Sequence, residues 1–279
     1  MSDAARPKYR LQDMSWLEAE EAFRRVDTAI VPVGTLHAHG PIPIGIDFRS
    51  VEVLADEIGK RTGVLVLPVV AYGENDKMKQ YPGTIAIDAE TLRAVYTDIC
   101  RSLRRNGIRR VIFLNGHGGN HEPLLRAGRT ARELGMLVAI VGWGEIERAL
   151  MPHVFTRGNY TSRFAFAELG MAVAIDGLAI ADLREGVYKG EWGFDPIVKP
   201  VLGDRIAPAG FSSFTFAGAP VTIPVDAWEV DDESPPRVDA ALLEELRQQG
   251  SETLARMTDY ISAFVREFQT VKIPPVPPA

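Results

Sequence analysis

A single cysteine, Cys100, occurs among the 279 residues, so the chain cannot form an internal disulfide. One free thiol suits a reducing compartment, and we expect the protein in the cytoplasm. No stretch approaches the roughly 20 consecutive apolar residues of a membrane-spanning helix. Residues 1–10 are polar and lack the apolar segment of a signal peptide. Basic residues are outnumbered, 31 against 37 acidic ones, which argues against nucleic acid and anionic membranes as main partners.

The rest of the composition is that of an ordinary globular protein. Hydrophobic residues make up 46% of the chain and charged residues 24%, a balance that allows a sizeable core. The length permits one large domain or two small ones, and we find no internal repeat.

Strand-like and helix-like segments alternate along the first half of the chain. The expected strands are largely apolar and are therefore predicted to be buried on both faces: 28–33, 64–70, 109–114 and 136–142. The expected helices are 15–25, 49–61, 88–106 and 122–134, with Ser15 and Asp88 as capping residues and Gly107 ending the third. This alternation predicts an α/β fold, a three-layer α/β/α sandwich with a mostly parallel sheet.

The second half of the chain has weaker patterns. Residues 145–163 lack periodicity and are predicted to be a long functional loop, whereas 186–236 are predicted to be irregular or antiparallel. Apolar residues at helical spacing predict a long helix over 238–268. The proline-rich end, 273–279, is expected to be extended.

Four of the five histidines lie in two short, glycine-flanked segments. His37 and His39 follow the first predicted strand and precede Asp47, while His117 and His121 follow the third. Ligands bind at the carboxyl ends of parallel strands. Imidazoles and carboxylates gathered there are the ingredients of a metal site, although a solvated loop is the simpler alternative.

The spacing of these residues suggests how each could act. His37 and His39, two apart in an extended segment, point to the same side. Asp47 is either the N-cap of the following helix or a carboxylate that bridges two metal ions. His117 lies in a glycine-rich loop that could turn its ring inward, and this loop lacks the Gly-Lys-Ser/Thr ending of a phosphate-binding loop.

Three acids are candidates for proton transfer. Glu168 lies in an apolar run, where an unpaired carboxylate is costly, so a metal partner or a place on a helix surface would explain it. Glu74 and Glu145 follow the second and fourth predicted strands. We expect His121 and Glu122 at a helix start to have supporting roles, and His153 to lie on the surface.

Several segments resemble the creatininase family. They are Val31-Pro32-Val33-Gly34 followed by His39-Gly40-Pro41 and Asp47, then Tyr81-Pro82-Gly83-Thr84, and Asn115-Gly116-His117-Gly118-Gly119-Asn120. The resemblance covers roughly residues 10–180. It implies one α/β/α domain over 1–279, a site for Zn²⁺ or Mn²⁺ with one or two ions per subunit, hydrolase chemistry on a small-molecule substrate and a homo-oligomer, most often a hexamer.

Transferred residue by residue, the resemblance places His39, Asp47 and His117 on the family's metal ligands. His37 stands where the family has a ligand Glu. Glu168 aligns with the acid of a His-Ala-Gly-Glu segment, whose histidine is replaced here by Ala165, and Ile42 replaces another family histidine. These departures argue against ordinary creatinine hydrolysis. They favour another small, polar, cyclic substrate: a cyclic amide, a lactone or a keto-inositol ring such as a 3-dehydro-scyllo-inosose.

Two alternatives stay open. A TIM-barrel amidohydrolase also carries His-x-His at a first strand, but it needs eight strand–helix units and only about four are recognisable here. The other alternative is a catalytically silent relative that binds a metal or a sugar, in which the missing histidine marks lost activity.

Overall fold

The computed structural model describes residues 8–39, 42–151, 154, 166–183, 205–210, 213–226 and 238–276. Four parallel strands form the central sheet in the order β2-β1-β3-β4. Their bounds are Thr28–Val33 (β1), Leu65–Val66 (β2), Arg110–Asn115 (β3) and Leu137–Gly142 (β4). This open parallel sheet confirms the predicted α/β fold and is not the start of a TIM barrel.

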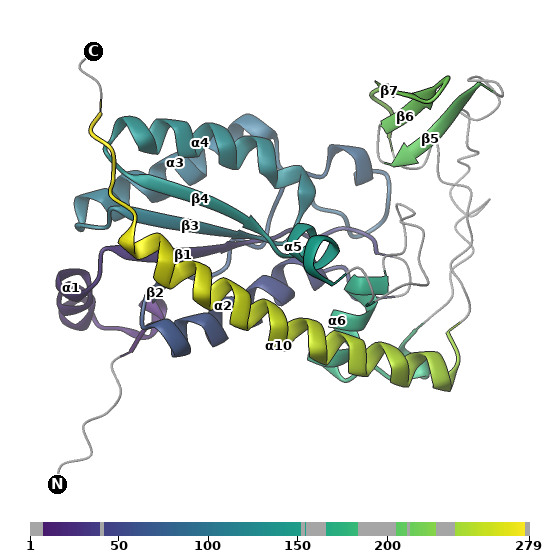
Figure 1. The fold of residues 1–279 in the computed structure, drawn as a ribbon, viewed down its shortest axis with the longest axis horizontal. Helices are drawn as coiled ribbons and strands as arrows, with labels where there is room; N and C mark the ends of the chain where they lie inside the picture. The colour runs from purple at the N-terminus through teal and green to yellow at the C-terminus, as the bar shows by residue number, and fades with distance from the viewer. Residues whose placement is uncertain are drawn as a thin grey trace, which may run out of the picture.

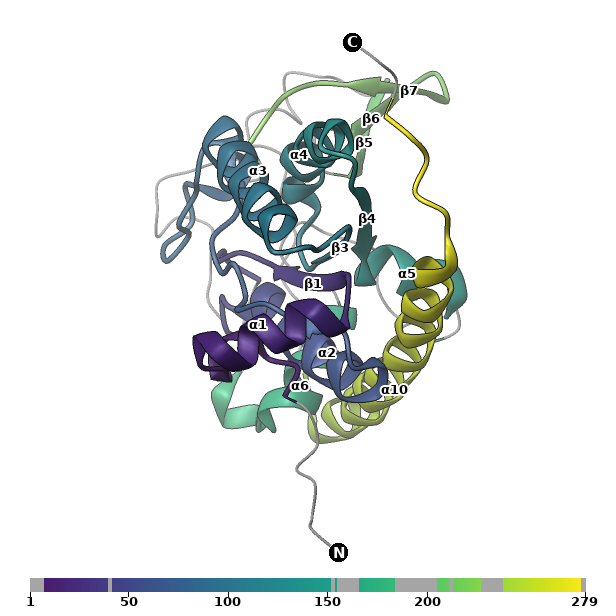
Figure 2. The ribbon, with the colours of Figure 1, turned by 90° about the vertical axis from the view of Figure 1, so that its left-hand side faces the viewer.

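Helices cover both faces of the sheet (Figures 1 and 2). One face carries α3 (Ala89–Arg105) and α4 (His121–Glu133). The other carries α2 (Ile46–Thr62), α6 (Phe166–Asp176) and the long α10 (Ala240–Thr270). The remaining helices within the described residues are α1 (Trp16–Arg25), α5 (Trp143–Leu150) and the short 3₁₀ segments Leu11–Asp13, Asp76–Met78, Gly118–Asn120 and Ile180–Asp182. No described helix is long and apolar enough to cross a bilayer.

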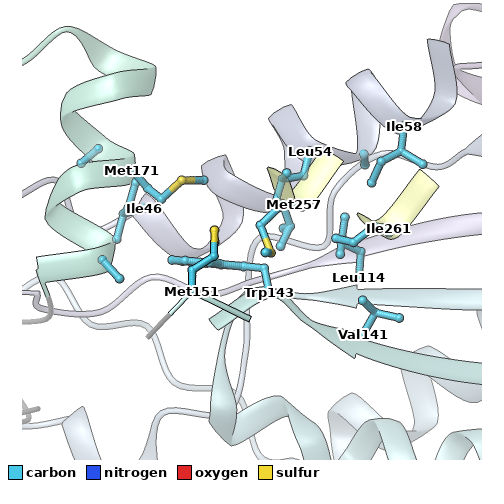
Figure 3. Packing of buried hydrophobic residues seen from close by; sticks show 14 of the residues in the cluster. Ile46, Leu54, Ile58, Leu114, Val141, Trp143, Met151, Met171, Met257 and Ile261 are labelled. Atoms are coloured by element: carbon cyan, nitrogen blue, oxygen red, sulfur yellow. The ribbon is translucent and has the colours of Figure 1, made fainter. Parts of the chain in front are cut away.

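Alternating strand residues divide the core into two layers, as the pleat of a strand requires. Ile112 and Leu114 of β3 belong to the cluster beneath α2, α6 and α10, whereas Val111 and Phe113 pack against α3 and α4. Figure 3 shows the first layer, in which Leu54 and Ile58 of α2 lie close to Met257 and Ile261 of α10. Ile46, the first residue of α2, is fully buried in this layer. It anchors the start of α2 beside the strand ends.

Local signals account for several helix boundaries. The capping box predicted at Ser15 is present: Glu18 N donates to Ser15 Oγ at 3.3 Å, and Ser15 N donates to Glu18 Oε2 at 2.8 Å. Asp88 caps α3 by accepting from Glu90 N at 2.8 Å. Gly107 has φ 91° after α3, a conformation that favours glycine.

Two predicted boundaries were wrong. The second strand was expected over 64–70, but only Leu65 and Val66 form a ladder with β1. Leu67 N still donates to Ile30 O, but the next hydrogen bond to β1 runs from Val70 N to Pro32 O, one residue later than a regular ladder requires. The regular pairing therefore ends before a single bridge joins Val33 and Val70. The helix expected near 49–61 begins at Ile46. Asp47 therefore lies within its first turn, and the N-cap position belongs to Gly45.

The second half differs in part from expectation. The predicted loop 145–163 is wrong at its start, because α5 extends to Leu150. The expected antiparallel structure exists as β5 (Ile206–Gly210), β6 (Ser213–Phe216) and β7 (Ala219–Thr222), drawn green in Figure 1. The expected long helix is α10, displaced by two residues. His153, Ala165, most of 151–165 and much of 186–236 lie outside the described residues.

Candidate functional site

Five side chains from four parts of the chain meet at the carboxyl ends of β1 and β3. They are His37 and His39 from the loop after β1, Asp47 from the first turn of α2, His117 after β3 and Glu168 from α6. Their nitrogen and oxygen atoms form two groups able to hold a metal ion. We call His37, Asp47 and His117 the first triad, and His39, Asp47 and Glu168 the second triad. Asp47 belongs to both.

The first triad is compact and buried. His37 Nε2 lies 3.1 Å from Asp47 Oδ2 and 3.2 Å from His117 Nδ1. His117 Nδ1 lies 3.0 Å from the same Asp47 oxygen. The three side chains are 6%, 1% and 16% exposed for His37, Asp47 and His117. Three ligand-type atoms are therefore held in a triangle with sides of about 3 Å, away from bulk water.

The second triad is more open. His39 Nε2 lies 3.1 Å from Asp47 Oδ1 and 3.6 Å from Glu168 Oε2. The Glu168 side chain is 28% exposed, against 5% for His39. The two Asp47 oxygens are thus divided, with Oδ2 facing the first triad and Oδ1 facing the second.

Backbone carbonyls fix the ring orientation of all three histidines. His37 Nδ1 lies 2.9 Å from Ala38 O, and His39 Nδ1 lies 3.0 Å from His37 O. His117 Nε2 lies 2.9 Å from Glu74 O. A carbonyl oxygen only accepts hydrogen bonds, so each of these nitrogens carries the proton and the opposite nitrogen of a neutral ring presents a lone pair. In all three rings that lone pair faces Asp47.

This arrangement fits a cation. Lone pairs of imidazole and carboxylate repel one another at 3.0–3.2 Å unless a proton or a metal ion lies between them. In addition, Asp47 Oδ1 is buried and makes no hydrogen bond to the described groups, despite its closeness to His39. Burying such an oxygen without a partner is costly, and a divalent ion would supply the missing partner.

In the first triad the electrostatics of His37 and Asp47 favour the protonation states that metal binding needs. Desolvation, reinforced by the charge of His39, lowers the pKa of His37 to about 4, so its ring is neutral at pH 7. Desolvation opposes ionisation of Asp47, but the surrounding histidines hold its pKa well below the usual value. The second triad differs: burial raises the pKa of Glu168, and His39, despite its desolvation, has its pKa raised to about 9 by Asp47 and Glu168. The His39 ring therefore carries a proton at pH 7 that a metal ion would have to displace.

Glycines allow the elements to approach closely enough to build the site. A Cβ at Gly116, just after β3, would overlap the backbone carbonyl of Asp47. A Cβ at Gly34, just after β1, would overlap the backbone of Phe48. The first turn of α2 therefore fits between the two strand ends only because neither position carries a side chain.

Two asparagines position the site, although the sequence patterns did not single them out. Asn115 holds His117 through Nδ2 to His117 O at 2.7 Å and through His117 N to Asn115 Oδ1 at 3.2 Å. Asn120 is fully buried and joins two loops, donating to Gly34 O at 3.0 Å and accepting from Glu74 N at 3.0 Å. Both asparagines lie in the glycine-rich segment around His117. Their place in that segment was the one feature of the sequence that could have pointed to a role in the site.

The other acids predicted for proton transfer have different positions. Glu74 contributes its backbone carbonyl to His117, while its carboxylate accepts from Asp76 N at 3.1 Å. Glu145 is exposed on α5 and belongs to neither triad. His121 is exposed at the start of α4, and Glu122 pairs with Arg126 at 2.5 Å on the surface.

Comparisons with known proteins agree with this fold. The family model for creatininase, described as creatinine amidohydrolase, matches residues 12–172. Creatinine amidohydrolase of Pseudomonas putida is 32% identical over 115 residues, which cover 39% of this chain and 44% of that protein. A mycofactocin precursor peptide peptidase of Mycolicibacterium smegmatis is 34% identical over 109 residues, covering 37% and 44%.

A third relative, a 3-dehydro-scyllo-inosose hydrolase of Thermotoga maritima, is 30% identical over 109 residues, covering 38% of this chain and 35% of that protein. The chain thus matches less than half the length of each of these curated relatives.

Solved structures extend the likeness in fold to nearly the whole chain. A manganese form of creatininase gives a TM-score of 0.69 at 21% identity and covers 96% of this chain and 100% of its own. A creatininase variant of Zn-Zn type gives 0.70 at 21% identity, covering 96% and 99%. Since the family model spans residues 12–172, more than half of the 279 residues, the chain belongs to the creatininase family.

Proposed function

We propose that the protein is a metal-dependent hydrolase, a single domain over 1–279 that acts on a small polar, cyclic substrate. The observation that carries this proposal is the pair of triads that share the buried carboxylate of Asp47. A Zn²⁺ or Mn²⁺ ion bound in such a site supplies an acidified water near pH 7 and polarises a substrate carbonyl. One or two ions per subunit would fit the two triads.

Each residue of the two triads has a separate role in this proposal. His37 and His117 would hold an ion at the first position and His39 and Glu168 one at the second, while Asp47 faces both positions. Because Asp47 is 1% exposed and lies in the first turn of α2, it would set the spacing of the two positions. The carbonyl of Glu74 keeps the His117 ring in the orientation that leaves Nδ1 free for a ligand role.

When only the first position holds an ion, Glu168 is not a ligand and is the best candidate for proton transfer among the three acids predicted from the sequence. It is the one that lies within the cluster, and burial raises its pKa, which makes its carboxylate a stronger base than an exposed one. Its 28% side-chain exposure gives it a route for protons to solvent. Glu74 would act through its carbonyl, and Glu145 is not part of this proposal.

The substrate class follows from the family and from this chain's departures from it. The relatives carry three different substrate names, creatinine, a precursor peptide and an inosose. His37 in place of the family's Glu and Ala165 in place of its His argue against ordinary creatinine hydrolysis. Cyclic amides, lactones and keto-inositol rings, cleaved beside a carbonyl, are the classes to test.

The test is an assay of the metal-free protein, prepared with a chelator, before and after addition of Zn²⁺ or Mn²⁺. Three groups of compounds are tested as substrates: lactams, among them creatinine; lactones; and keto-inositols. We expect metal-dependent turnover of one class, lost in Asp47→Ala and kept in Asp98→Ala, a matched change at a 70% exposed carboxylate. Metal binding without turnover on the whole panel would contradict the proposal and favour the catalytically silent relative.

We also propose that the protein works in the cytoplasm as a homo-oligomer, most simply a hexamer, on the strength of its family. Light scattering at micromolar concentration tests the assembly. A mass equal to the 30.7-kDa chain would refute it.

A further inference from the structure

The two metal positions differ in the atoms that they offer. The first triad presents two imidazole nitrogens and one carboxylate oxygen, whereas the second presents one imidazole nitrogen and oxygens from two carboxylates. Imidazole favours zinc, copper and nickel, while carboxylate oxygens suit magnesium, calcium and manganese. His37 makes this difference, because a carboxylate at its place would give both positions the same donor set.

The two positions also differ in how close the spacing of their ligand atoms already is to that around a bound ion. Ligands of a tetrahedral zinc with bonds of 2.0–2.1 Å lie roughly 3.3–3.4 Å apart. The first triad already has sides of 3.0, 3.1 and 3.2 Å, so a small expansion would admit the ion. In the second triad one side is 3.6 Å and Glu168 is 28% exposed. Binding there requires a partly exposed side chain to be ordered, which costs conformational entropy.

Asp47 couples the two positions. A cation held by Asp47 Oδ2 neutralises much of the charge that Oδ1 offers to a second ion, and the two cations repel each other at short range. The second ion is therefore bound more weakly whichever metal it is. Among the three ligands of the second position, His39 is neutral when bound and Asp47 also serves the first ion. Glu168 therefore supplies the one negative charge that belongs to the second position alone.

From these contrasts, and resting on the proposed function, we propose that the two positions are loaded in a fixed order with different selectivity. Zinc binds first and tightly to His37, Asp47 and His117. The position formed by His39, Asp47 and Glu168 fills second, exchanges readily and accepts Mn²⁺.

The test is a titration of the metal-free protein with Zn²⁺ against a chromogenic chelator, followed by Mn²⁺ binding measured from the EPR signal of free Mn²⁺. We expect the first zinc to bind at least about tenfold more tightly than the second. Protein carrying one equivalent of zinc should then take up one Mn²⁺ without releasing that zinc. Two zinc sites of equal affinity, or release of the first zinc by Mn²⁺, would overturn the proposal.

Two variants assign the order to residues. Glu168→Gln should keep the tight zinc and lose the Mn²⁺ site, whereas His37→Glu should weaken the first zinc at least about tenfold and admit a second Mn²⁺. Loss of the tight zinc in Glu168→Gln, in a variant that remains folded by circular dichroism, would reverse the assignment and overturn the proposal.

Measurements on the unaltered protein cover the case in which a variant does not fold. Crystals loaded with one equivalent of each metal should show zinc anomalous scattering at the first triad and manganese at the second. The reverse placement would overturn the proposal. Protein that binds Mn²⁺ but no zinc would overturn this proposal alone, whereas protein that binds neither metal would contradict the proposed function, so the two failures are distinguishable.

Discussion

The carboxylate of Asp47 in α2 faces the imidazole of His117 at the end of β3, with Oδ2 and Nδ1 3.0 Å apart. Gly116, the neighbour of His117, makes this approach possible because it lies directly against the Asp47 carbonyl. The pairing of these two residues therefore depends on backbone packing as much as on their side chains.

Gly116→Ala should separate α2 from β3. The added methyl group would overlap the Asp47 carbonyl, and overpacking of this kind costs about 1–3 kcal/mol. We expect that loss in urea unfolding of the metal-free protein, together with weaker zinc binding. Gly118→Ala is the matched control, since a Cβ there meets nothing within 4 Å. Equal stability of the two variants would show that the close approach is unimportant.

Asn120→Ala should weaken metal binding without removing a ligand. Asn120 is fully buried and joins Gly34 O to Glu74 N, and leaving those backbone groups without a partner costs about 1–3 kcal/mol. The loosened Glu74 carbonyl would no longer hold the His117 ring. Zinc affinity measured by chelator competition should fall, whereas Asn106→Ala, on the exposed end of α3, should leave it unchanged. An unchanged affinity in Asn120→Ala would remove Asn120 from the account.

Acid should destabilise the fold partly through Asp56. Although partial burial opposes its ionisation, hydrogen bonds from Arg10 at 2.5 Å, Lys60 at 2.8 Å and Tyr9 at 2.6 Å hold its pKa below the ordinary 3.8. A lowered folded-state pKa contributes stability above pH 3.8, and that stability is lost as the pH falls further.

Asp56→Asn should therefore lower the free energy of unfolding at pH 7 by about 1 kcal/mol and have less effect near pH 2. Urea unfolding at the two pH values measures this difference. An effect that is larger at pH 2 than at pH 7 would contradict the assignment.

The sequence predicted those parts of the fold that depend on local rules. Continuous apolar runs identified β1, β3 and β4, and the side chains of Ser15 and Asp88 marked the starts of α1 and α3. The bounds of β2 were wrong because the irregular pairing beyond Leu67, where Val70 N donates to Pro32 O, depends on how the two strands meet and leaves no local pattern in the sequence.

The site was predictable as a set of residue types but not as a geometry. His37, His39, Asp47 and His117 stood out as polar residues at strand ends, and the structure brings all four together with Glu168. The division of Asp47 between two triads depends on where α2 begins, which the sequence placed three residues late. Asn120 was missed because its contacts join segments far apart in the chain.

The most direct test of the central claim is the metal content of the purified protein and of Asp47→Ala, measured by elemental analysis. Since Asp47 belongs to both triads, we predict one to two equivalents of zinc or manganese per chain in the unaltered protein and the loss of most of it in the variant. Asp98→Ala should keep the full content, because Asp98 lies exposed on α3. A metal-free native protein, or full occupancy in Asp47→Ala, would contradict the account.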